Sequence, residues 1–159
     1  IKKGTRHFLD YLRRIIDLQK NNICDLAGTG LEDPELPEYI LRQKYVETLL
    51  LNDNNLRSLH TSVTRLMSLK LINLDNNKLE AIPGCVLHLT CLETLQLGDN
   101  NLLEVHSDIA KLKNLRHLSL KGNPNLAFLP PAMGMLTSLE TCDVSSCPMR
   151  GPPQEVVNE

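Results

Sequence analysis

Apolar residues recur at regular positions in the stretch from Leu92 to Asn114, LETLQLGDNNLLEVHSDIAKLKN. Its first half alternates apolar and polar residues, as a half-buried strand does, and its second half spaces apolar residues by three or four. One polar residue, Asn100, interrupts the apolar pattern where the strand pattern ends. The stretch therefore predicts a strand, a turn and a loosely helical return. The apolar positions are Leu92, Leu95, Leu97, Leu102, Val105, Ile109 and Leu112.

The same pattern recurs about every 23 residues along most of the chain. An irregular first unit over 21–45 has Thr29 where the later units have asparagine, and the last unit runs to Glu159. Three or more stacked repeats build a continuous core, and this chain has about six. We therefore expect residues 21–159 to form one repeat array. The regular units begin at Val46, Leu69, Leu92, Leu115 and Leu139.

Stacking explains which residues repeat. Adjacent strands lie about 4.8 Å apart, so each inward position becomes a column of touching side chains. An asparagine amide both donates and accepts, so it can satisfy backbone groups that are freed where the chain leaves the strand. Cys147 takes this place in the last unit. The predicted inward columns are Leu49, Ile72, Leu95, Leu118 and Cys142, and Leu51, Leu74, Leu97, Leu120 and Val144; the asparagine ladder is Asn54, Asn77, Asn100 and Asn123.

Residues 1–20 do not fit the repeat. Thr5 is a plausible N-cap, and Phe8, Leu12, Ile15 and Ile16 follow helical spacing. The first unit of a solenoid has no upstream neighbour, so we expect this amphipathic helix to cap the array. A partner-binding helix is the alternative.

The return segments carry a resemblance to a known family. Pro83 and Pro130 belong to the pattern L-x-x-L-P-x-x-I-x-x-L, whereas His60 and His106 replace the proline in the other clean units. Over residues 21–157 the chain resembles intracellular leucine-rich repeat proteins, similar to Shoc-type Ras-pathway scaffolds and plant Ras-group repeat proteins. The resemblance implies an α/β right-handed horseshoe, with a parallel sheet on the concave side and short helical or 3₁₀ turns on the convex side. It also implies protein binding on the concave sheet.

The two ends resemble parts of one closing motif of such arrays. The chain ends PPQEVVNE and begins IKKGTRHFLDYLRR, and it does not start with methionine. We therefore expect it to be a segment of a larger protein, with more chain on both sides.

Composition limits the partners. The formal net charge is −2 and the sequence pI is about 6.2, and aromatic residues make up only 3% of the chain. We therefore expect neither a nucleic-acid nor a membrane partner. Five cysteines at repeat positions do not form a disulfide framework, which favours a cytoplasmic location. The histidines are scattered and the cysteines lack metal-ligand spacing, so we expect no catalytic residue, metal or cofactor.

Residues between the inward positions of each strand project from the expected concave face. This face is polar and mildly acidic, and it favours a partner with a partly basic surface. An ordinary solvated sheet is the alternative, and the lack of an aromatic or arginine anchor argues for weak or extended binding, or for a site elsewhere. The candidate partner-binding residues are Leu50, Asn52, Leu71, Asn73, Asp75, Thr94, Gln96, Asp99, His117 and Lys121.

Two functions remain open. The first is a non-catalytic scaffold that binds a protein partner, and the resemblance suggests a small GTPase or a phosphatase. The second is a regulatory or spacer segment of a larger enzyme, such as a repeat array beside a GTPase or kinase domain.

Overall fold

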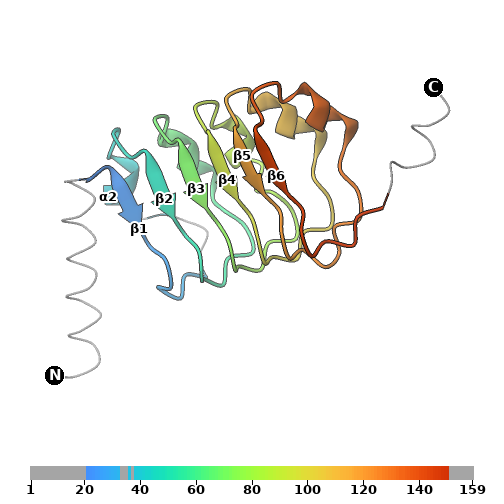
Figure 1. Ribbon diagram of the computed structural model, residues 1–159. Coiled ribbons are helices and arrows are strands. Elements are labelled where there is room, and N and C mark those ends of the chain that lie inside the picture. Colours follow the sequence, from blue (N-terminus) through green and yellow to red (C-terminus); the bar gives the residue numbers. More distant parts are fainter. Residues whose placement is uncertain (1–20, 33–35, 37, 151–159) are drawn as a thin grey trace.

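The computed structural model describes residues 21–32, 36 and 38–150, and within them six short strands form one parallel sheet in chain order (Figure 1). Short returns, mostly 3₁₀ turns, lie on the far side of the sheet, so the expected repeat solenoid is confirmed. The strands are β1 (Ile23–Asp25), β2 (Thr48–Leu50), β3 (Leu71–Asn73), β4 (Thr94–Gln96), β5 (His117–Ser119) and β6 (Thr141–Asp143). The returns contain α2 (Glu38–Leu41), η1 (Thr61–Arg65), η2 (Val86–His88), η3 (Ser107–Lys111) and η4 (Pro131–Met135).

Two sequence-based predictions lie outside the described residues. The capping helix over 1–20 is one of them. The other is the closing motif at the C-terminus, which falls within 151–159.

Every strand pairs with the next in the same register. Leu49 lies opposite Ile72, Ile72 opposite Leu95, and Leu95 opposite Leu118. These four residues are buried, as are Leu51, Leu74, Leu97 and Leu120 in the second column. The inward columns of β2 to β5 are therefore confirmed, and they form the aliphatic core.

The asparagine ladder is also confirmed. The Nδ2 of Asn100 donates to the carbonyl of Leu97 in its own unit (3.2 Å) and to that of Leu74 in the preceding unit (2.9 Å). Its Oδ1 accepts from the backbone N–H of Leu79 at 3.0 Å. Each ladder amide thus joins two units. Asn54, Asn77 and Asn123 make the same three kinds of bond.

The irregular end units substitute other donors at the ladder position. The Thr29 hydroxyl donates to the carbonyl of Leu26 at 2.8 Å, which is the bond that the asparagine makes within later units. The Cys147 thiol donates to the carbonyl of Leu120 at 3.1 Å, which confirms that a thiol can stand in at this place. Each substitute makes fewer bonds between units than an asparagine does.

Two predicted burials are wrong. Cys142 keeps the register of the inward column, opposite Leu118, but it is exposed, and Val144 is only half-buried. Within the described chain no strand follows β6, so nothing covers the outer side of these residues. Between β3 and β4, Cys85 is buried and Cys91 is exposed.

The histidines that replace proline at the start of a return cap its 3₁₀ turn. His60, His106 and Pro130 have φ of −71°, −67° and −70°, so all three adopt the same extended conformation. The Nδ1 of His60 accepts from the Ser62 N–H, and that of His106 accepts from the Asp108 N–H. The imidazole thus satisfies a free N–H at the start of the turn, a structural role.

Candidate functional site

The outward side chains of the six strands make one continuous surface, here called the sheet face, which is the face expected to be concave. Two columns run across it, one at the first and one at the third residue of each strand. Most of these side chains are half-buried against their neighbours, and those of β6 are exposed. The columns are Ile23, Thr48, Leu71, Thr94, His117 and Thr141, and Asp25, Leu50, Asn73, Gln96, Ser119 and Asp143.

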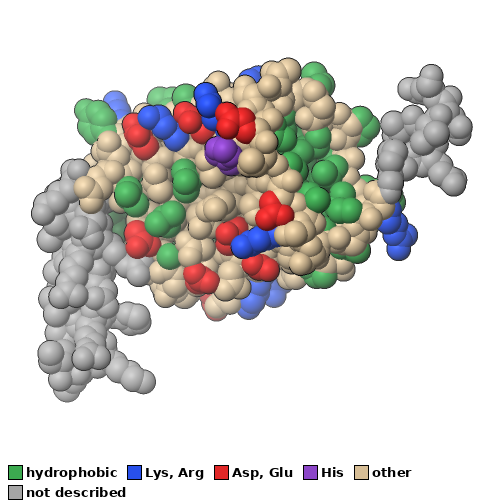
Figure 2. Space-filling model, in the orientation of Figure 1, with side chains coloured by type: hydrophobic (Ala, Val, Ile, Leu, Met, Phe, Trp, Pro, Cys, Tyr) green, Lys and Arg blue, Asp and Glu red, His purple; other side chains and the backbone are tan. Residues whose placement is uncertain are grey.

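Hydrophobic side chains gather on the sheet face over β1 to β3 (Figure 2). The predicted pair Leu50 and Leu71 lies on adjacent strands, and both residues are half-buried. Ile23, which the prediction missed, shares a column with Leu71 and is 37% exposed. We call Ile23, Leu50 and Leu71 the apolar corner.

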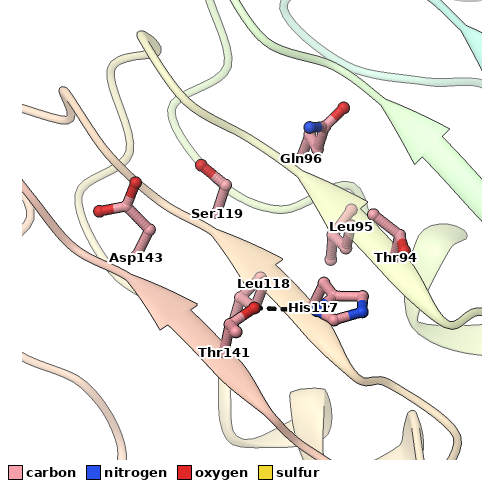
Figure 3. Close-up of a pocket in the computed structure, with 8 residues that line it drawn as sticks. All are labelled: Thr94, Leu95, Gln96, His117, Leu118, Ser119, Thr141 and Asp143. Atoms are coloured by element: carbon pink, nitrogen blue, oxygen red, sulfur yellow. Dashed lines mark hydrogen bonds between the residues drawn. The ribbon is translucent and has the colours of Figure 1, made fainter.

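A shallow hollow of about 300 Å³ opens on the sheet face over β4 to β6 (Figure 3). Buried Leu95 and Leu118 contribute to its lining, and His117 Nδ1 is hydrogen-bonded to Thr141 Oγ1 across its edge at 2.9 Å. The volume is at the lower limit of small-molecule pockets, so it suits one or two side chains. The lining consists of Thr94, Leu95, Gln96, His117, Leu118, Ser119, Thr141 and Asp143.

The hollow includes only part of the predicted set. Thr94, Gln96 and His117 line it, whereas Ser119, Thr141 and Asp143 line it without having been predicted. Ser119 and Asp143 continue the Gln96 column and Thr141 continues the His117 column, so the repeat register carried the signal that could have found all three.

Two predicted residues at the carboxyl ends of the strands interact with each other instead. Asp75 Oδ1 accepts from the Gly98 N–H at 2.6 Å. The Lys121 side chain lies over Gly98 so closely that its Cε would be 2.8 Å from an added Cβ. Burial raises the pKa of Asp75, and the Gly98 N–H and the charge of Lys121 oppose that rise.

Three other predicted residues help to form the turns at the carboxyl ends of the strands. Asn73 Oδ1 accepts from the Asp75 N–H, and Asn52 Nδ2 donates to the Asp53 carboxylate. Asp99 has a φ of 52°, a left-handed conformation that aspartate adopts more readily than most residues. Asn52, Asn73 and Asp99 thus help to shape the backbone. The left-handed position recurs once in each regular unit, as Asp53, Asn76, Asp99, Gly122 and Ser146.

Acidic and basic side chains alternate along one border of the sheet face (Figure 2), a feature that the sequence reading missed. Each stands directly before a strand, and Lys70 pairs with Glu47 at 3.1 Å while Arg116 pairs with Glu140 at 3.0 Å. Glu93, between these two pairs, makes no ion pair with any described residue. This charge ladder consists of Glu47, Lys70, Glu93, Arg116 and Glu140.

The described residues contain no group of three or more His, Cys, Asp or Glu side chains placed to hold a metal ion. Burial raises the pKa of the Cys85 thiol, which disfavours the nucleophilic thiolate. Across the same residues, none of the helices has the length and apolar character needed to cross a membrane.

Comparisons with known proteins agree with the fold. A family model described as leucine rich repeat matches residues 44–102, and a second with the same description matches residues 114–136. Together the two matches cover about half of the chain. A search of curated proteins finds no matching relative.

Several solved structures are similar over most of this chain. One is the leucine-rich repeat ectodomain of the plant membrane receptor kinase GASSHO1/SCHENGEN3 from Arabidopsis thaliana, in complex with Casparian strip integrity factor 2. It is 29% identical in sequence with a TM-score of 0.61, and the match covers 76% of this chain and 15% of that one. The plant peptide hormone receptor RGFR1 in complex with RGF2 is 30% identical with a TM-score of 0.59, over 77% of this chain and 20% of that one.

A third neighbour shows the fold alone. The leucine-rich repeat domain of APL1B is 21% identical with a TM-score of 0.73, over 94% of this chain and 42% of that one. The chain thus spans less than half of the length of each of these three neighbours.

Proposed function

Because this chain is a leucine-rich repeat protein, we propose that it is a non-catalytic interaction module that holds a protein partner on its sheet face. Repeat solenoids present extended surfaces that serve for binding. The observation that carries the proposal is that one continuous face bears side chains that do not contribute to the packing between repeats. Leu50, Leu71, Thr94 and Gln96 are outside the core, and no hydrogen bond joins the side chains of Thr94 or Gln96 to other described residues.

Two of the structural neighbours support a protein or peptide as the partner. The Arabidopsis ectodomain is in complex with Casparian strip integrity factor 2, and the peptide hormone receptor is in complex with RGF2. Each shares about 30% identity with this chain over roughly three quarters of it. We extend from them only the class of partner, a polypeptide.

For the class of partner we propose a small GTPase or a phosphatase, and for the location the cytoplasm. The support is the resemblance of the return segments to those of intracellular scaffolds. The acidic character of the sheet face favours a partly basic surface on that partner, since complementary charges steer association.

A pull-down with purified full-length chain tests the proposal. Leu50→Arg and Gln96→Arg place a long charged side chain on the sheet face, and Met67→Arg places the same side chain on a return, where Met67 is 75% exposed. We expect the first two variants to lose the partner retained by wild type, and Met67→Arg to keep it. Circular dichroism and melting temperature establish that all variants are folded.

Retention of the partner by both sheet-face variants would contradict the proposal and move the site to another surface. Capture of no protein by wild type would favour the second candidate, a spacer or regulatory segment beside a GTPase or kinase domain. The length comparison supports keeping that candidate, since the neighbours are more than twice as long as the matched region.

A further inference from the structure

The sheet face offers two different kinds of contact at two places. The apolar corner over β1 to β3 exposes aliphatic carbon from Ile23, Leu50 and Leu71. None of the three belongs to the buried core. Water leaves such a surface favourably when another aliphatic side chain covers it.

The hollow over β4 to β6 has the chemistry to receive a cation. Its charged group is the Asp143 carboxylate, and the Gln96 and Ser119 side chains add hydrogen-bond acceptors (Figure 3). Asp143 Oδ1 accepts from the Ser145 N–H at 2.9 Å, and bonds from Ser145 keep the pKa of Asp143 below its ordinary value. The carboxylate is therefore ionised at neutral pH, and the Asp143 side chain is exposed.

The remaining lining also suits lysine or arginine. Leu95 and Leu118 are apolar, so they match the aliphatic stem that these side chains carry below their charged group. The charge of Lys121 acts to lower the pKa of Asp143, but the Lys121 side chain lies over Gly98 beside Asp75 and does not line the hollow. Charge complementarity thus favours a cation over an anion here.

The register sets the distance between the two places. The apolar corner centres between β2 and β3 and the hollow centres on β5, with parallel strands about 4.8 Å apart. The separation across the strands is then about 12 Å, and an extended segment covers it in about four residues at roughly 3.3 Å each.

We propose that the sheet face recognises an extended segment of a partner protein that carries an aliphatic residue and, about four residues away, a lysine or arginine. The aliphatic residue packs on the apolar corner, and the cation enters the hollow beside Asp143. This inference rests on the proposed function and specifies the partner's chemistry. It also explains how the sheet face can bind without an aromatic or arginine anchor of its own, because the partner supplies a cationic anchor.

Selection of a random twelve-residue peptide library on the immobilised full chain tests this spacing. We expect enriched peptides to carry lysine or arginine with an aliphatic residue about four positions away. On Asp143→Lys, selection should turn to peptides with aspartate or glutamate. The matched control Glu104→Lys makes the same charge change at an exposed residue outside the hollow and should leave the enriched set unchanged.

Affinities of enriched peptides, measured by fluorescence anisotropy, give the second readout. Asp143→Asn keeps the acceptor for Ser145 but removes the charge, and we expect about tenfold weaker binding from the loss of a charge-assisted hydrogen bond. Glu104→Gln should have no effect. Circular dichroism confirms folding in each case.

The outcomes separate this inference from the proposed function. If Leu50→Arg and Gln96→Arg abolish peptide binding but substitutions of Asp143 do not change it, the cation site is overturned and the sheet face remains the binding surface. Peptides indifferent to all of these changes would overturn both. Absence of enrichment, or enrichment without a basic residue, would also overturn the two-point recognition.

Discussion

The central rungs and the last rung share one register but differ in how much of it is buried. In β4 the inward residue Leu95 is fully buried between its neighbours, whereas the equivalent Cys142 in β6 is exposed. Both occupy the same position of the repeat. Burial in a solenoid is therefore a property of the stack, because each unit is covered by its neighbours and not by itself.

The polar ladder shows the same difference. Asn123 donates to carbonyls of two units and accepts from the Leu102 N–H, whereas the Cys147 side chain makes one hydrogen bond with the described residues, to the carbonyl of Leu120. Cys147 is also half-buried, and Asn123 is fully buried. A residue's contribution to stability should thus fall from the centre to the last rung, and the following substitutions measure that gradient.

Truncating the inward column should give the largest contrast. Leu95→Ala removes a fully buried side chain and leaves a cavity, so we expect a loss of about 3 kcal/mol in the free energy of unfolding. Cys142→Ala should cost less than about 1 kcal/mol, because its side chain is already exposed. Urea unfolding followed by circular dichroism measures both. Equal losses would mean that the last rung is covered in solution.

Removing the ladder amide should have the next largest effect. Asn100→Leu leaves the buried Leu79 N–H without its acceptor, at a cost of roughly 1–3 kcal/mol. It also removes one of the two amide donors from the carbonyls of Leu74 and Leu97, which keep only those of Asn77 and Asn123. The exposed neighbour Asn101 supplies the control, since Asn101→Leu should change the free energy by less than about 0.5 kcal/mol.

Cys147→Ala sharpens the ladder comparison at the last rung. A single bond from a weak thiol donor is lost there, so the cost should stay below about 1 kcal/mol. An unchanged melting temperature for Asn100→Leu would contradict the role assigned to the ladder.

The interior could be predicted from the sequence because stacking imposes one chemistry at each position. Leu95 touches its equivalents on both sides, so the same residue type recurs and the period becomes visible. Asn100 recurs for the same reason, since its amide must reach the preceding unit. Exposure of Cys142 could not be predicted this way, because the repeat pattern describes an interior unit.

The sheet face was harder to predict because stacking does not constrain it. Asp75 and Lys121 looked available in the sequence, yet both side chains lie against Gly98, and the charge of Lys121 acts to lower the pKa of Asp75. The sequence suggested that Asp99 binds a partner, but in the structure Asp99 occupies the turn position with left-handed backbone conformation. The charge ladder that includes Glu93 could have been found, because its members recur at the repeat period directly before each strand.

Substitutions at the left-handed turn position should give a smaller difference in stability between the central rungs and the last rung. Gly122 has a φ of 65°, and an added Cβ would collide with the Asp99 side chain, so Gly122→Ala should cost about 1–2 kcal/mol. Ser146, at φ 60° in the last rung, already bears that strain, so Ser146→Gly should stabilise by about 0.5 kcal/mol or less.

Gly134 provides the control for the glycine substitutions. It lies in η4, and an added Cβ would meet nothing within 4 Å, so Gly134→Ala should be close to neutral. Melting temperatures of the three variants give the order. A neutral Gly122→Ala would show that the turn can shift away from Asp99.

The smallest contrast is the pH dependence of two carboxyls, one central and one in the last rung. Burial raises the pKa of Asp75, so its ionised form costs stability above that pKa, and the cost disappears as pH falls below the ordinary aspartate value of about 3.9. Hydrogen bonds from Ser145 lower the pKa of Asp143, so that carboxylate contributes stability above the ordinary value and loses it as pH falls through the lowered pKa.

Asp75→Asn and Asp143→Asn should therefore shift the melting temperature in opposite directions at neutral pH. The Asp75 variant should melt slightly higher than wild type, because the amide oxygen still accepts from Gly98 without the cost of a half-buried charge. The Asp143 variant should melt slightly lower. Both differences should vanish in acid, once the wild-type carboxyls are protonated. Shifts of the same sign would mean that net charge, and not the position in the stack, determines what each carboxylate contributes.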